Sequence, residues 1–163
     1  MMQLALYQPD IPQNMGTILR MAACLDVAVE VIGPAGFDMS DRSLRRAGLD
    51  YLDAVRIIRH AAFADFERER RARGARLVLM TTASAVPYTE FAFRTGDVLL
   101  AGRESAGVPQ SVHESADARV AIPIKPGLRS LNVAVAAAMV LGEALRQTGG
   151  FAPLAAGGQT GEP

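Results

Sequence analysis

The chain has 163 residues, half of them apolar and 21% charged, which excludes a disordered or low-complexity protein and suits one domain with a single core. Seventeen basic residues balance seventeen acidic ones, so the net charge by itself indicates no class of partner. One cysteine and two histidines exclude a disulfide framework and a multi-cysteine zinc site, and we predict no metal centre.

Six apolar segments of strand length recur along the chain. They lie at residues 4–7, 27–32, 54–58, 77–80, 98–101 and 120–124. Most are continuous rather than alternating, which is typical of parallel strands that are covered on both faces. Helical patterns stand between several of them, at residues 17–25, 61–73 and 130–147. This alternation predicts an α/β domain with a mostly parallel sheet and helices on both faces.

The first predicted strand leads into a polar segment ahead of a helix. Asn14 is placed to cap this helix, Gly16 allows close approach of the backbone, and Arg20 follows in an otherwise apolar stretch. Ligands of α/β sheets bind beyond the carboxyl ends of the strands, where this segment lies. A plain helix cap and an arginine that reaches the surface explain the same residues.

The basic residues are concentrated in one part of the chain. Residues 1–41 have a net charge of −4, residues 42–76 of +5 and residues 77–163 of −1. A basic segment in a neutral chain can face an anionic partner. The Glu and Arg residues within 67–73 are explained by a solvated helix face, whereas a shorter and less balanced cluster leaves more room for a function. That cluster consists of Arg42, Arg45 and Arg46.

A glycine-rich loop follows the predicted strand 98–101. It contains Gly102, Glu104, Gly107 and Pro109, and so places an acid at the exit of the strand. The loop matches neither a dinucleotide fingerprint nor a phosphate-binding loop, because the required glycine spacing and lysine are absent. Its alternatives are a ligand site and an ordinary turn that carries a surface glutamate.

The last predicted helix begins with a third polar group. Ser130 is placed to cap it, and the amino end of a helix presents free amides to a polar or anionic group. Capping explains Ser130 but not its neighbours Arg129 and Asn132 at the mouth of an apolar helix.

Residues 134–141 of that helix are apolar nearly all round, which predicts burial on every side. A subunit interface and a central place in the monomer core are the two alternatives. The apolar run 133–142 is about half as long as a membrane span, and no basic segment precedes an apolar stretch at the N-terminus. We therefore expect no membrane association, no secretory signal and a cytoplasmic location.

In this order and spacing, the three polar segments resemble the three motifs of the SPOUT (SpoU–TrmD) superfamily of RNA methyltransferases. Pro9, Asn14, Gly16 and Arg20, and the run Leu-Arg-Arg-Ala-Gly-Leu-Asp-Tyr at 44–51, are similar to the small tRNA wobble-position 2′-O-methyltransferases. The resemblance covers residues 3–148. We expect one domain over residues 1–148 and a mobile tail over residues 149–163, which are rich in glycine and proline.

The resemblance implies a SPOUT fold with a C-terminal trefoil knot and a homodimer whose site is completed across the interface. It implies methyl transfer from S-adenosylmethionine, without a metal, to the ribose 2′-OH of nucleotide 34 (cytidine or uridine) in the tRNA anticodon loop. Methylation of rRNA or of another tRNA position is an alternative, and a non-catalytic RNA-binding dimer is a second one. A nicotinamide-dependent enzyme is disfavoured because the glycine fingerprint is missing after the first strand.

The same resemblance implies three sets of site residues. The residues implied for cofactor binding are Met80, Gly102, Ile122, Ile124, Ser130 and Leu131. The residues implied for catalysis are Asn14, Arg20, Glu104, Ser130 and Asn132. Contact with the anticodon loop falls to Arg42, Arg45 and Arg46, since proteins read single-stranded RNA loops through phosphate contacts and stacking.

Family accounts make Arg20 the general base, a task that suits a guanidinium poorly because it is effectively always protonated. The alternative is that Arg20 holds an adjacent phosphate and orients the ribose, while Glu104 orients Arg20 through a bidentate pair. Arg103 departs from the family pattern, since relatives commonly have proline there. Tyr51 and His60 are candidates either for RNA contact or for packing.

Overall fold

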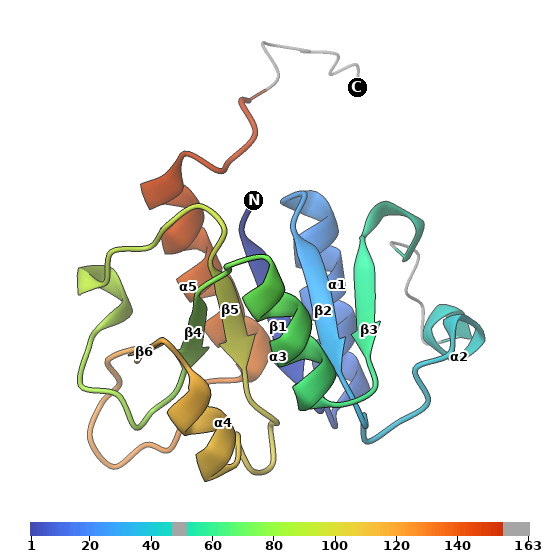
Figure 1. Cartoon of the computed structure of the whole chain (residues 1–163), viewed down its shortest axis with the longest axis horizontal. Coiled ribbons are helices and arrows are strands. Elements are labelled where there is room, and N and C mark those ends of the chain that lie inside the picture. Colours follow the sequence, from blue (N-terminus) through green and yellow to red (C-terminus); the bar gives the residue numbers. More distant parts are fainter. Residues whose placement is uncertain (47–51, 155–163) are drawn as a thin grey trace, which may run out of the picture.

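The computed structural model describes residues 1–46 and 52–154. Within them, six parallel strands form one sheet in the order β3-β2-β1-β5-β4-β6 (Figure 1). The strands are β1 (Gln3–Tyr7), β2 (Ala28–Ile32), β3 (Ile57–His60), β4 (Leu77–Met80), β5 (Val98–Ala101) and β6 (Ala118–Val120). The helices are α1 (Pro12–Cys24), α2 (Asp41–Arg46), α3 (Phe63–Ala72), α4 (Gln110–Ser115) and α5 (Val133–Thr148), with single 3₁₀ turns at Leu52–Ala54 and Tyr88–Glu90.

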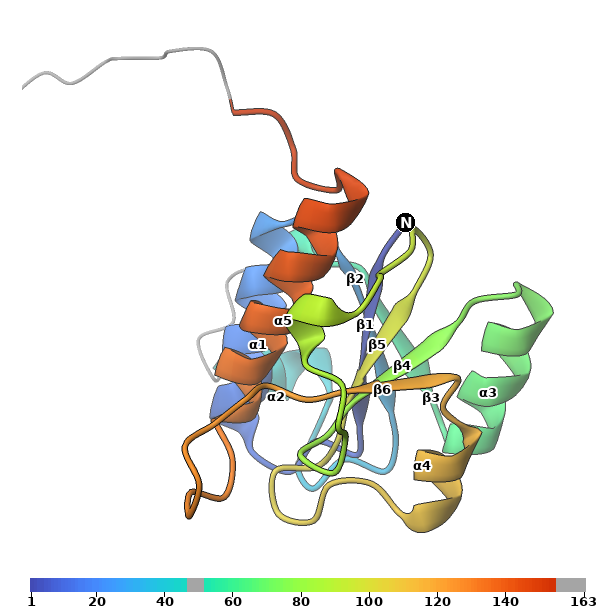
Figure 2. The same cartoon turned by 90° about the vertical axis from the view of Figure 1, so that its left-hand side faces the viewer.

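Helices cover both faces of the sheet, as predicted. α1 and α5 lie on one face, and α3 and α4 lie on the other (Figure 2). Because successive side chains of a strand point to opposite faces, Leu4 and Leu6 of β1 enter the core under α1 and α5. Ala5 and Tyr7 enter the second core, together with Phe66 of α3. The continuous apolar strands therefore reflect burial on both sides.

Two predicted helix caps are wrong. α1 begins at Pro12, whose fixed φ suits the first helical position, so Asn14 lies inside the first turn instead of capping it. α5 begins at Val133, and its cap is Asn132, whose side-chain oxygen accepts hydrogen bonds from the amides of Ala134 (2.8 Å) and Val135 (3.3 Å). Ser130 therefore lies two residues before the cap of α5. The side chain of Asn14 is not used as a helix cap, and Asn132 takes the capping role that was predicted for Ser130.

Two strand boundaries also differ from the predicted ones. β3 starts at Ile57, three residues late, and ends at His60, whose Nε2 lies 2.8 Å from Oε2 of the buried Glu30 on β2. β6 ends at Val120, and Ala121 pairs instead with the segment after β4 through backbone hydrogen bonds of 2.9 Å with Val86 and Tyr88. Residues 122–124 therefore leave the sheet.

Of the two alternatives for α5, a central place in the core of the single chain is wrong, and coverage by a second subunit stays a prediction. Ala137, Val140 and Leu141 are buried, but Val135 and Met139 on the outer side are 50% and 38% exposed. One apolar side of α5 is thus left uncovered by the rest of the described chain. No helix within residues 1–46 and 52–154 is long and apolar enough to span a bilayer.

Candidate active site

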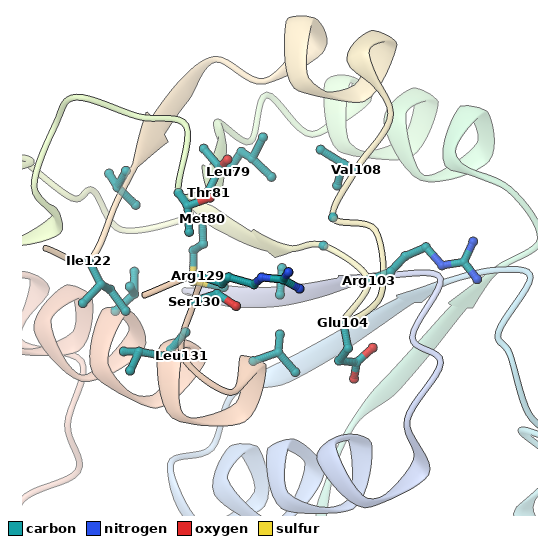
Figure 3. Close-up of a pocket in the computed structure, with 18 of the residues that line it drawn as sticks. Leu79, Met80, Thr81, Arg103, Glu104, Val108, Ile122, Arg129, Ser130 and Leu131 are labelled. Carbon is teal, nitrogen blue, oxygen red and sulfur yellow. The ribbon is translucent and has the colours of Figure 1, made fainter. Parts of the chain in front are cut away.

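A cavity of about 300 Å³ opens at the carboxyl ends of β4, β5 and β6 (Figure 3). The segments that follow these strands and the first half of α5 form its walls. All six residues predicted for cofactor binding line it: Met80, Gly102, Ile122, Ile124, Ser130 and Leu131. The structure thus brings together residues that are up to fifty positions apart in the sequence.

The loop after β5 is closed so tightly that it requires glycine. Arg103 and Gly107 exchange two backbone hydrogen bonds of 2.9 Å each, and Gly107 has a φ of 64°. A Cβ on Gly102 would lie 2.8 Å from the carbonyl carbon of Gly107, closer than real Cβ contacts come. Gly102 therefore keeps the backbone of this loop narrow beside the cavity.

The character of the cavity fits a nucleoside-like group. Met80, Ile122 and Ile124 supply apolar surface for a flat ring, and the loop at Gly102 brings backbone groups within reach. Arg103, Arg129 and Glu104 also line the cavity and are its charged residues. Within the described part of the chain, no three metal-binding side chains come together.

Hydrogen bonds join the predicted catalytic residues at the edge of this cavity. The amide of Asn14 donates from Nδ2 to Oε1 of Glu104 (3.3 Å), and Nδ2 of Asn132 donates to Oδ1 of Asn14 (2.8 Å). Asn132 is at the same time the cap of α5. The start of α1, the loop after β5 and the start of α5 are therefore linked through three side chains.

Glu104 also has a reciprocal contact with Asp10. The Asp10 amide donates to Oε2 of Glu104 (3.1 Å), and the Glu104 amide donates to Oδ1 of Asp10 (3.2 Å). Burial and the neighbouring Asp10 raise the pKa of Glu104 above its usual range. Hydrogen bonds with Glu104 and Ser105 lower the pKa of Asp10 to about 2. Of the two carboxyl groups, Asp10 is the one that stays ionised and Glu104 the one that protonates first.

Arg20 stands apart from this cluster in the single chain. It lies on the exposed side of α1, six residues beyond Asn14, and does not line the cavity. The structure thus brings Asn14, Glu104 and Asn132 together and places Ser130 in the cavity wall, while Arg20 lies on the exposed side of α1 and is not among the lining residues.

The predicted RNA-contact cluster lies on α2, at the other end of the sheet (Figure 1). Arg42 is exposed, and Arg45 forms an exposed ion pair with Asp53 (2.6 Å). The side chain of Arg46 and all of residues 47–51, Tyr51 among them, fall outside the described residues. His60 is buried against Glu30 and Phe66, which favours its packing interpretation.

Sequence reasoning missed Asp10 and Ser105, whose hydroxyl donates to the Asp10 carboxylate. Asp10 follows β1 at the edge of the sheet where ligands bind, and this position was the available signal. Arg103 lines the cavity, with its side chain extending away from Ser130, while its neighbour Glu104 faces the start of α1 (Figure 3). Arg103 lies between Gln8 (3.4 Å from NH1 to Oε1) and Asp10 (3.7 Å from Nε to Oδ2).

Comparison with known proteins adds the family to this geometry. Residues 1–142 match the model of the SpoU rRNA methylase family. The chain belongs to the SpoU methylase family. The resemblance seen in the three motifs is thereby confirmed.

Similar proteins of this family include several of the same length. A protein of Beijerinckia indica named tRNA (cytidine(34)-2′-O)-methyltransferase is 64% identical over 149 residues, which cover 91% of this chain and 93% of the relative. The protein of the same name from Escherichia coli K12 is 36% identical over 154 residues, covering 91% of this chain and 95% of the relative.

Two solved structures of SpoU-type enzymes show the fold. One, described as giving insights into the 2-OH methylation of C/U34 on tRNA, has a TM-score of 0.82 and 42% identity over 90% of this chain and 95% of that chain. An AdoMet-bound rRNA methyltransferase from Sinorhizobium meliloti has a TM-score of 0.79 and 32% identity over 89% of this chain but only 56% of that chain.

Proposed function

We propose that this member of the SpoU methylase family is a tRNA 2′-O-methyltransferase that uses S-adenosylmethionine and acts on cytidine or uridine at position 34, the wobble nucleotide of the anticodon loop. The observation that carries the proposal is that two groups of residues lie at one edge of the sheet. One is the residues predicted for cofactor binding, and the other is the hydrogen-bonded side chains of Glu104, Asn14 and Asn132. Relatives of matching length and up to 64% identity carry the name of this activity.

In the proposed complex, the cavity takes the nucleoside part of the cofactor. Met80, Ile122 and Ile124 enclose the adenine ring, and backbone groups near Gly102 and Leu131 bind its polar edge. When bound, S-adenosylmethionine supplies the methyl group for the ribose 2′-oxygen. The AdoMet-bound structure of a rRNA methyltransferase with 32% identity supports this assignment.

The side chains at the cavity edge then orient the ribose. Asn14, Ser130 and Asn132 offer amide and hydroxyl groups that can align a 2′-OH, and Glu104 fixes Asn14 from behind. Alignment supplies much of the acceleration of such a transfer, because the oxygen and the methyl carbon must lie in line. No metal takes part in the proposed reaction.

Arg20 enters the site from the second copy of the chain in a proposed homodimer. Its exposed place on α1, the helix that packs against α5, suits such an interface. Because a guanidinium stays protonated at neutral pH, we assign Arg20 to a phosphate next to the target ribose, with the hydroxyl proton leaving to another acceptor.

The remaining expectations belong to the same proposal. Residues 1–148 form one domain, and the C-terminal part of that domain forms a trefoil knot. Hydrogen bonds of 2.9 Å from Ala121 to Val86 and from Tyr88 to Ala121, which hold the segment after β6 against the loop after β4, agree with such a path. Arg42, Arg45 and Arg46 contact the anticodon loop of the tRNA, and the enzyme is cytoplasmic. Residues 155–163 of the predicted tail lie outside the described residues.

Methylation of rRNA is the second candidate, favoured by the rRNA methyltransferase from Sinorhizobium meliloti. That chain is longer, since this chain covers only 56% of it. The tRNA anticodon loop is the preferred substrate, because the relatives of 64% and 62% identity are named tRNA (cytidine(34)-2′-O)-methyltransferase.

The test is methyl transfer from labelled cofactor to unmodified total tRNA by the wild type, by Arg20→Ala and by Arg68→Ala, which removes an exposed arginine on the far face. We expect transfer by the wild type and by Arg68→Ala, and a loss of at least about a hundredfold in Arg20→Ala. Cofactor binding without transfer to tRNA would favour rRNA as substrate. Absence of both would leave an RNA-binding dimer as the better account.

A further inference from the structure

Asp10 lies where three segments at the edge of the proposed site meet. It follows β1, precedes α1 by one residue, and contacts the loop after β5 through both of its carboxylate oxygens. Oδ1 accepts from the Glu104 amide at 3.2 Å, and Oδ2 accepts from the Ser105 hydroxyl. Its own amide donates to Oε2 of Glu104 at 3.1 Å, so backbone and side chain of both residues are engaged in a closed ring.

A third segment holds Asp10 from the other side. The Gly36 amide donates to the Pro9 carbonyl at 2.9 Å. A Cβ on Gly36 would lie 2.9 Å from the Cβ of Asp10, so only glycine allows the chain after β2 to come this close. Asp10 is therefore confined between the segment after β2 and the loop after β5, and its carboxylate has little room to move.

The local charges keep this carboxylate ionised. The pKa of Asp10 lies at about 2 because of its hydrogen bonds with Glu104 and Ser105, and the Arg103 guanidinium nearby adds to the effect. A negative charge fixed in this way next to Glu104 contributes to the raised pKa of Glu104. The two carboxyl groups thus have different contacts: Asp10 holds the loop after β5, whereas Glu104 accepts a hydrogen bond from Asn14.

We infer that Asp10 is a positioning residue for methyl transfer: its carboxylate fixes the backbone at Glu104 so that Glu104 holds Asn14, which in turn holds Asn132 at the start of α5. The inference rests on the proposed function, since it concerns the same site. It assigns Asp10 no contact with cofactor or substrate; Asp10 acts through Glu104.

The experiment compares Asp10→Ala and Asp10→Asn with the matched control Asp65→Asn, which removes an exposed carboxylate paired with Arg68 on α3. We measure kcat and KM for tRNA, cofactor affinity by calorimetry, and Tm. We expect kcat to fall about tenfold to a hundredfold in Asp10→Ala, with cofactor affinity within about threefold of wild type. Asp10→Asn keeps one of the two acceptor oxygens and loses less, and Asp65→Asn retains the wild-type rate.

A second readout needs neither cofactor nor RNA. Titration of the Glu104 carboxyl by NMR in Asp10→Asn should give a lower pKa for Glu104 than in the wild type, because a neighbouring negative charge has been removed. The acid limb of the kcat profile should shift to lower pH in the same variant. A purely structural role of Asp10 would lower Tm and cofactor affinity together with kcat, whereas the positioning role lowers kcat while cofactor affinity stays near that of the wild type.

The outcomes separate the inference from the proposed function. An unchanged kcat in Asp10→Ala, in a preparation where the wild type methylates tRNA, overturns the role of Asp10 alone. Loss of kcat that follows the loss of cofactor affinity overturns it as well. Absence of transfer by the wild type overturns the proposed function, and the NMR titration then still decides whether Asp10 controls Glu104.

Discussion

The cavity edge and the surface of α2 are both polar, but they are built from different kinds of contact. At the cavity edge, the hydrogen-bonded residues Asn14 and Asn132 are 118 residues apart in the sequence, and the linked side chains come from three separate segments. On α2, Arg45 pairs with Asp53 only eight residues away, and the two side chains are 51% and 78% exposed. Connected networks fix geometry, whereas exposed ion pairs exchange readily with solvent or with another anion. The first region suits chemistry, and the second suits contact with a polyanion.

The largest effect should come from a substitution that displaces the loop after β5, beside the cavity. Gly102→Ala places a methyl group against the Gly107 backbone, so the loop must move. We expect cofactor affinity, measured by calorimetry, to fall by at least about tenfold, since a displacement near 1 Å in a site is that costly. Gly74→Ala is the control, because its φ of 67° costs stability away from the cavity. Equal affinities in Gly102→Ala and wild type would show that the loop does not shape the site.

A pair of substitutions at Asn132 separates its cap from its link to Asn14. Aspartate caps a helix as well as asparagine does but cannot donate to Oδ1 of Asn14. Asn132→Asp should therefore keep the wild-type Tm and lower kcat about tenfold or more. Asn132→Ala should lower both kcat and, by about 1 kcal/mol, the free energy of unfolding. A wild-type kcat in Asn132→Asp contradicts the importance of the link.

Acid should weaken the cavity edge through Asp10. Its pKa is lowered in the fold from 3.8 to about 2, so the folded state binds this proton less readily than the unfolded chain does. The stability that Asp10 contributes is therefore complete above about pH 4 and is lost as the pH falls toward about 2. Urea titrations between pH 2 and pH 5 should show a shallower pH dependence in Asp10→Asn. An unchanged slope would mean that Asp10 is not held in this way.

The smallest effects should come from α2. Arg45→Ala should leave Tm unchanged and raise KM for tRNA about threefold, while lowering the dependence of binding on salt. Asp53→Asn releases Arg45 from its ion pair, so we expect equal or tighter binding of tRNA. Filter-binding titrations over a range of salt concentrations measure both. A loss of kcat comparable to that in Asn132→Asp would erase the distinction between the two regions.

Local patterns predicted the parts of the molecule that local physics controls. The strands Leu77–Met80 and Val98–Ala101 were placed correctly because burial on both faces leaves an unbroken apolar run. The caps at Asn14 and Ser130 were wrong because several polar residues near each helix start satisfy the same preference.

Contacts between distant residues had no such signal. The motif resemblance brought the cofactor residues together, but nothing in the spacing linked Asp10 to Glu104, 94 residues away, or placed Gly36 beneath Asp10. The apolar pattern of α5 likewise could not decide between a subunit interface and a central place in the core, since an apolar helix has the same pattern whether its partner belongs to its own chain or to another.

The most direct measurement is the position of the methyl group. Unmodified tRNA is incubated with the wild-type protein and labelled S-adenosylmethionine, and mass spectrometry of nuclease digests locates the label. The account predicts a single 2′-O-methylated ribose at cytidine or uridine 34. Label on a base or at another tRNA position, or no label in tRNA, would contradict it.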